Sequence, residues 1–214
     1  MVESVEQKNT AVSWPTVGLI GGITAVFLGY LSVWIPGPAA GLQFIGVEVG
    51  EWLKFLGVGR VRNIFYFPPI TLGVIIVLYS FGWSNRRLQS WVWRALGCGI
   101  ALISFPALED IRGASQGDYF PRIWLILSVW VLFLIITGIS FRQIDSKWPQ
   151  TVVYLVIAIL GIVGAFYPTW LYNAVRPAVA LVMGESIGIG LGVYLNALGH
   201  FLISVTALTK LRQV

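Results

Sequence analysis

One histidine lies within an apolar run near the end of the sequence, and it allows the widest range of chemistry. His200 shares a stripe of spacing four with Gly192, Asn196 and Ser204, which places it on a helix face that packs against protein rather than lipid. Three interpretations stay open. The ring hydrogen-bonds a neighbouring helix as structural glue, or it lies in a proton or substrate path. Alternatively it binds a cofactor as the single axial ligand of a chlorin or haem, because Gly192 and Gly199 leave room for a flat ring.

A glutamate is the second candidate, because it interrupts an amphipathic segment. Residues 42–56 place their apolar side chains on one half of a helical wheel, which predicts an interfacial helix, and Glu48 falls inside that half. A carboxylate there must pair, protonate or reach water. Its candidate partners are Arg60, Arg62, Arg112 and Arg176. Glu48 either forms a salt bridge that docks the segment onto the bundle or is a titratable acid that faces a substrate.

Further acidic candidates lie in the segments between apolar runs. Glu109, Asp110 and Asp118 cluster with Arg112 just before Arg122. They are either solvated loop charges or an acidic mouth for a cation or a partner. Glu185 is added because Pro-Ala followed by Glu recurs after the first, third and fifth apolar runs, which suggests three helical hairpins in parallel.

Several common kinds of site are excluded by residue type. One histidine and one cysteine, Cys98, cannot form a metal cluster, an intrachain disulfide or a bis-histidine haem site. No phosphate loop with its lysine is present. The glycines of 188–192 lie inside an apolar run with no preceding strand, so they do not indicate a dinucleotide loop. This lack of a catalytic constellation favours a protein that is not an enzyme.

The composition indicates that lipid is the solvent. The chain is 57% hydrophobic and 11% charged, and its mean hydropathy is +0.82, whereas soluble domains have roughly 25% charged residues. We therefore expect an all-α, polytopic membrane helix bundle that forms a single domain over 1–214. A membrane helix needs about 20 apolar residues. Six runs fit, with Pro68 and Pro69 near the start of the second: about 15–36, 64–83, 90–108, 121–141, 150–173 and 187–208. The first run is expected to be a retained helix rather than a cleaved signal peptide.

Small residues recur at spacings of three and four in the first, fifth and sixth runs. Gly18 and Gly22 begin the first stripe, Gly161 lies in the second, and Gly192 lies in the third. Small residues let helix backbones approach closely in lipid. These three helices are therefore expected to form the tightly packed centre of the bundle.

The basic residues predict the orientation. With six spans, the side that holds both termini has eight basic residues: Lys8, Arg86, Arg87, Arg94, Arg142, Lys147, Lys210 and Arg212. The other side has six: Lys54, Arg60, Arg62, Arg112, Arg122 and Arg176. The termini are thus expected to face the cytoplasm across a prokaryotic-type plasma membrane. The net charge of +5 points to lipid rather than to nucleic acid.

Three functions are compatible with these patterns. The first is a non-enzymatic subunit or accessory component of a larger membrane complex, in contact with other membrane protein chains. The second is a small transporter or permease for a small solute or ion. The third is a lipid-modifying membrane enzyme that acts through Glu48 or Glu109, which requires two of the acids to converge in one pocket.

Overall fold

The computed structural model describes residues 14–37, 39–113, 116–141 and 147–213, and in this part of the chain the fold is almost entirely helical. The α-helices are α1 (Trp14–Tyr30), α2 (Gly46–Trp52), α3 (Phe67–Tyr79), α4 (Leu88–Leu102), α5 (Leu108–Arg112), α6 (Phe120–Phe141), α7 (Lys147–Met183) and α8 (Leu191–Leu211). Short 3₁₀ segments are η1 (Ala40–Leu42), η2 (Leu53–Leu56), η3 (Gly59–Tyr66) and η4 (Gln116–Asp118). Two short strands, β1 (Val33–Ile35) and β2 (Phe44–Ile45), pair antiparallel.

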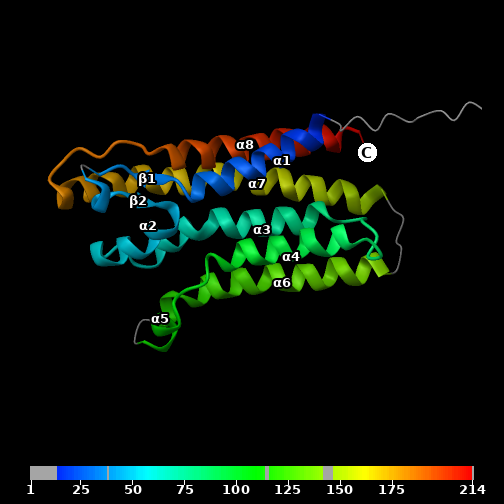
Figure 1. The fold of residues 1–214 in the computed structure, drawn as a ribbon, viewed down its shortest axis with the longest axis horizontal. Helices are drawn as coiled ribbons and strands as arrows, with labels where there is room; N and C mark the ends of the chain where they lie inside the picture. The colour runs from blue at the N-terminus through cyan, green and yellow to red at the C-terminus, as the bar shows by residue number, and fades with distance from the viewer. Residues whose placement is uncertain (1–13, 38, 114–115, 142–146, 214) are drawn as a thin grey trace, which may run out of the picture.

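The long helices form two groups of three that run back and forth along one axis (Figure 1). Helix α8 packs along α1 and α7, while α3 packs against α4 and α6 and joins the two groups through α7 and α1. Helix α1 begins and α8 ends at the same end of the bundle, which we call the terminal end. The opposite end, the cap end, carries β1, β2, α2, η2, η3, α5 and the last turns of α7.

Four stretches of the described residues are long and apolar enough to cross a membrane. They are Gly59–Tyr79, Phe120–Phe141, Gln150–Met183 and Leu191–Leu211. Helices α1 and α4 are shorter, with 17 and 15 residues. The expected helical bundle with membrane-spanning helices is therefore confirmed.

Small residues bring α1, α7 and α8 together as predicted, but these helices form one of the two groups rather than the centre of the bundle, which is occupied by α3. A Cβ atom on Gly22 would lie 2.8 Å from the carbonyl oxygen of Gly199, and a Cβ on Gly199 would lie 2.9 Å from the carbonyl oxygen of Gly22. A Cβ on Gly161 of α7 would likewise lie 2.8 Å from the His200 carbonyl oxygen. The helix backbones are therefore in direct contact.

Several predicted spans have the wrong ends. The second and third runs were expected to reach 83 and 108, but α3 ends at Tyr79 and α4 at Leu102. The first run was expected to be helical to residue 36, but the helix ends at Tyr30 and β1 follows it. Strand β1 contains Val33 and Ile35, whose β-branched side chains favour extended backbone, and Pro36 cannot continue a helix. The fifth run was expected to end at 173, but α7 continues to Met183 through Pro168 and Pro177.

The predicted interfacial helix over 42–56 is wrong as one continuous element. The segment is divided into β2, α2 and η2. Its buried residues Val49 and Leu53 pack in a second hydrophobic core with Trp34 and Phe65. Trp34 is fully buried, and its indole donates to the carbonyl oxygen of Gly29 at 2.9 Å. Because tertiary packing around Trp34 provides the apolar surroundings, the segment does not need a single lipid-facing face.

Candidate functional site

The His200 side chain of α8 lies between α3 and α7, and each of its two ring nitrogens has a hydrogen-bond partner. The side chain is fully buried. Nδ1 lies 3.0 Å from the Asn196 carbonyl oxygen, and Nε2 lies 2.9 Å from the hydroxyl of Thr71 on α3. A Cβ atom on Gly164 of α7 would overlap the imidazole ring. This geometry matches the structural-glue interpretation, because binding a metal through Nε2 would require the ring to leave Thr71.

Asn196 compensates for a proline in the neighbouring helix. Pro168 lies inside α7 and has no N–H for the carbonyl oxygen four residues earlier, that of Gly164. The Asn196 side chain donates to that oxygen at 3.2 Å. The sequence stripe through Asn196 and His200 thus holds α8 against α7 and α3.

An ion pair between a buried arginine and a half-buried glutamate joins the cap to α6, and the sequence did not single out this glutamate. The Arg122 side chain is 1% exposed, and its Nη1 lies 3.1 Å from Oε1 of Glu51 on α2. The Tyr66 hydroxyl donates to the same oxygen at 2.7 Å. The guanidinium carbon lies 3.8 Å from the centre of the Tyr66 ring and 5.2 Å from that of Tyr119. The arrangement combines a charge-assisted hydrogen bond with cation–π contacts.

The surroundings of Glu51 keep its carboxylate charged. Burial raises the pKa of Glu51, but the hydrogen bond from Tyr66 and the charge of Arg122 outweigh it, and the pKa lies below its ordinary value. Lys54 lies 3.8 Å from Glu51 and 3.7 Å from Asp110, so it connects the two acids. Burial, followed by the negative charges of Glu51 and Asp110, raises the pKa of Tyr119. The carboxylate held in this way docks α2 onto α6.

Several buried polar atoms near this pair have no hydrogen-bond partner among the described residues. They are the Tyr30 hydroxyl, Oε2 of Glu51, and Nε and Nη2 of Arg122. Buried donors and acceptors of this kind are usually satisfied by ordered water. The chemistry available here is therefore hydrogen bonding that fixes the N-terminal end of α6 to the cap.

The acids that the sequence singled out do not converge. Glu48 on α2, Glu109 on α5 and Glu185 in the segment between α7 and α8 are exposed, and no ion pair between described residues joins them. The Glu48 carboxylate accepts the Ile45 backbone N–H at 3.1 Å. Glu48 was expected in an apolar half. It lies instead in the exposed first turn of α2, because β2 changes the backbone direction just before the helix.

A second buried arginine lies toward the terminal end. Arg94 on α4 was counted among the basic residues on the side of the termini, and it is fully buried. It donates to the hydroxyls of Ser80 at 2.9 Å and Ser140 at 3.1 Å and to the side-chain oxygen of Asn85. These neutral acceptors tie α4 to α6 and to the turn after α3.

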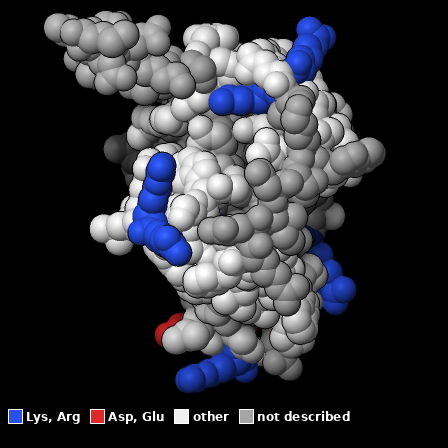
Figure 2. Space-filling model, turned by 90° about the vertical axis from the view of Figure 1, so that its right-hand side faces the viewer, with Lys and Arg blue, Asp and Glu red and all other residues white. Residues whose placement is uncertain are grey.

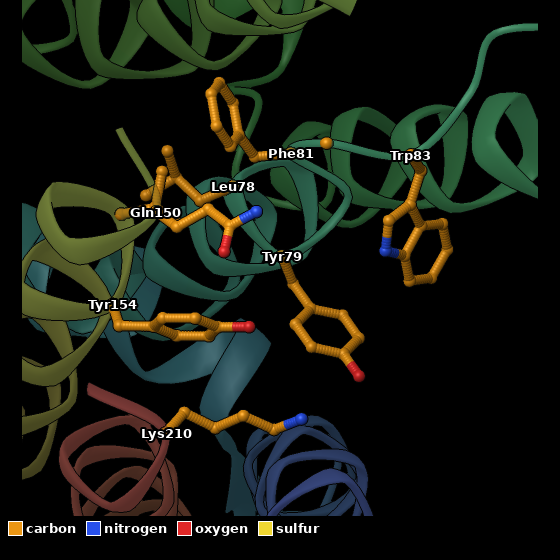
Figure 3. Close-up of a pocket in the computed structure, with 9 residues that line it drawn as sticks. Leu78, Tyr79, Phe81, Trp83, Gln150, Tyr154 and Lys210 are labelled. Carbon is orange, nitrogen blue, oxygen red and sulfur yellow. The ribbon is translucent and has the colours of Figure 1, made fainter. Parts of the chain in front are cut away.

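The terminal end also carries a hollow that the sequence did not predict. A pocket of about 260 Å³ opens there, with Lys210 from α8, Gln150 and Tyr154 from α7, and Tyr79 and Trp83 from α3 and the turn after it (Figure 3). A hollow of about 440 Å³ shares Gly82 and Trp83 with it and is also lined by Arg87, Gln89, Ser84 and Ser90. Figure 2 shows this end of the molecule, with Lys and Arg exposed around it. The pocket could not be read from the sequence, since its residues come from segments more than 120 positions apart.

No set of three His, Cys, Asp or Glu side chains in the described residues could hold a metal ion. No family model, curated protein or solved structure matches this chain. A functional conclusion therefore rests on the geometry of the chain itself.

Proposed function

We propose that this chain is a six-span integral membrane protein that acts without catalysis of its own, as a subunit or accessory component of a larger membrane complex. Its termini face the cytoplasm, and it belongs to a prokaryotic-type plasma membrane. The partner is an apolar helix of another membrane protein, seated along α7.

The proposal of a partner helix is supported by an apolar stripe on α7 that is longer than the hydrocarbon core of a bilayer. Exposed side chains follow one face of the helix at spacings of three and four: Val152, Leu155, Ile159, Ile162, Phe166, Trp170, Ala174, Pro177 and Leu181. At 1.5 Å per residue the stripe is about 43 Å long, against about 30 Å for the hydrocarbon core. Lipid tails alone cannot cover it.

Helix tilt does not remove this mismatch. Placing a 43 Å stripe inside a 30 Å core needs a tilt of about 45°, beyond the usual range of 0–40°. The neighbouring helices α6 and α8 have 22 and 21 residues, and at that tilt they would span only about 23 Å. The bundle therefore fits the bilayer upright, and the end of α7 around Leu181 projects with its apolar face uncovered.

The interior supports a non-catalytic role. His200, Asn196 and Arg94 are each hydrogen-bonded to other helices or turns, and Glu51 is paired with Arg122. Interactions of this kind position helices rather than substrates. They also weigh against a substrate path through the interior of the bundle, which would need these polar groups to be free of protein partners.

The back-and-forth course of the chain supports six spans and the orientation. Helices α1 and α4 complete the antiparallel bundle beside the four longer spans (Figure 1). Arg86, Arg87 and Arg212 are exposed at the terminal end. By the positive-inside rule, these residues support a cytoplasmic position for that end.

The test makes the projecting end of α7 polar, at Leu181 in the stripe and at Val182 beside it. In the double variant Leu181→Gln, Val182→Gln, both exposed apolar side chains become polar. We expect the wild-type chain, extracted into lipid nanodiscs without detergent exchange, to elute with a second membrane protein. The double variant should elute without it, because a partner helix would have to bury two unpaired amides.

Phe55→Gln is the matched control, because Phe55 is 78% exposed in the cap but lies on η2 rather than on α7. It should retain the partner. A wild-type chain that elutes alone would contradict the proposal. So would a chain bound only to further copies of itself, or a double variant that keeps its partner.

A further inference from the structure

The pocket at the terminal end is rich in hydrogen-bond donors that the protein does not use. The hydroxyls of Tyr79 and Tyr154, the amide of Gln150 and the indole N–H of Trp83 make no hydrogen bond to another described residue, and all four residues line the pocket. Figure 3 shows these polar groups gathered around one space, with the Lys210 ammonium below them. The donors outnumber the acceptors, so the pocket suits a group with several oxygen acceptors.

The charge of the pocket is positive and not neutralised by any described acid. The Lys210 ammonium lies 3.1 Å from the hydroxyl of Thr16, which is a neutral partner, and no acid among the described residues forms an ion pair with it. The acidic side chains of the described residues all lie in the cap and in the segments next to it: Glu48, Glu51, Glu109, Asp110, Asp118 and Glu185. Arg87 adds a second cation in the adjoining hollow. An oxyanion is therefore the complementary ligand.

The depth of the pocket favours an anion that belongs to a lipid. Tyr79 is the last residue of α3, and Lys210 lies in the last turn of α8. Both positions fall at the level where helices leave the hydrocarbon core, which is also where tryptophan and tyrosine side chains concentrate. Leu78 and Val153 form apolar walls of the same pocket. They offer a surface to an acyl chain, which a free phosphate ion would leave unused.

The aromatic wall is held in place before any ligand binds. The Trp83 and Trp93 rings meet edge to face with centres 6.1 Å apart, and Tyr79 lies 5.5 Å from Trp83. Rigid donors lose little conformational entropy on binding. We propose that this pocket binds the phosphate of an anionic phospholipid, with Lys210 as the charge partner and Tyr79, Tyr154 and Gln150 as hydrogen-bond donors.

The experiment measures lipid binding to the delipidated full chain by native mass spectrometry. Phosphatidylglycerol and phosphatidylcholine with identical short acyl chains are the probes. We expect phosphatidylglycerol to bind more tightly. Lys210→Gln should weaken that binding about fivefold, since one lysine contributes roughly 1 kcal/mol toward an anionic lipid. Tyr154→Phe should weaken it less, and Lys210→Arg should retain it because the charge remains.

Arg86→Gln is the matched control, because it removes one positive charge from the same end but does not line either hollow. It should leave the affinity unchanged. Equal losses from Arg86→Gln and Lys210→Gln would overturn the proposal in favour of diffuse surface charge. Displacement of the lipid by millimolar inorganic phosphate would overturn it in favour of a free-anion site. If Lys210→Gln lowers the thermal unfolding midpoint, the other two variants test the proposal. Full binding by Lys210→Arg together with weaker binding by Tyr154→Phe would support it, and any other result would overturn it.

Discussion

Single polar residues in this bundle are placed where a helix needs a hydrogen-bond partner. Asn196 supplies the donor that Pro168 removes from α7, and His200 reaches Thr71 on α3. In lipid no water replaces a missing partner, so each such residue fixes the position of a neighbouring helix. Their sequence stripe predicted that they face protein, and the structure agrees. The partners were not predictable, because Thr71 lies 129 positions from His200.

The tight packing around His200 gives a prediction at the same scale. Gly164→Ala places a methyl group into the imidazole ring, and we expect it to destabilise the folded state by about 2 kcal/mol, as overpacking does. Gly99→Ala is the matched control, because a Cβ atom there meets nothing within 4 Å. It should be neutral or raise stability by up to about 1 kcal/mol through helix propensity.

Thermal unfolding of the two variants in one detergent measures the difference. Equal midpoints for Gly164→Ala and Gly99→Ala would show that α7 can move away from His200 without cost. The role of that ring as a packing element would then have to be abandoned.

Among the elements, α2 is the one whose buried and exposed acids the sequence predicted wrongly. A wheel drawn over 42–56 placed Glu48 among apolar residues and Glu51 on the polar half, yet Glu48 is exposed and Glu51 binds the buried Arg122. The wheel assumed one uninterrupted helix. Strand pairing between β1 and β2 interrupts it, and periodicity within 42–56 does not record a pairing with residues that precede the segment.

The docking of α2 onto α6 predicts acid sensitivity. The pKa of Glu51 is lowered in the folded chain from the ordinary 4.5. Its contribution to stability is therefore fully present above that value and is lost as the pH falls through the lower, folded-state pKa. Glu51→Gln should lower the unfolding midpoint near neutral pH, and the difference from wild type should shrink as the pH falls through the folded-state pKa of Glu51.

Glu48→Gln controls for the loss of one carboxylate from the same helix. Its side chain is exposed, so its unfolding midpoint should stay close to that of wild type across this pH range. A constant difference between Glu51→Gln and wild type at every pH would contradict the linkage between this carboxylate and the docked cap.

For the whole molecule, composition and run length were enough to predict a membrane helix bundle, but they did not define the ends of the helices. An apolar run indicates that its residues are surrounded either by lipid or by the protein core, and α7 is long enough to have both surroundings. The N-terminal half of α7 packs along the bundle, and its C-terminal half packs Leu171 and Val175 onto the core around Trp34. Because both environments are apolar, hydropathy alone cannot distinguish a long helix from a span that ends at the membrane surface.

The arrangement of the two ends gives a prediction for the molecule as a whole. Cys98 is buried and is the single cysteine of the chain, so Cys98→Ala provides a background for new thiols. Glu109→Cys lies at the cap end and Gln213→Cys at the terminal end, and both positions are exposed. In right-side-out vesicles an impermeant maleimide should label Glu109→Cys at once and Gln213→Cys only after permeabilisation. The reverse order would invert the orientation that the basic residues predict, whereas labelling of both thiols from one side would contradict a bundle whose ends lie on opposite sides of the membrane.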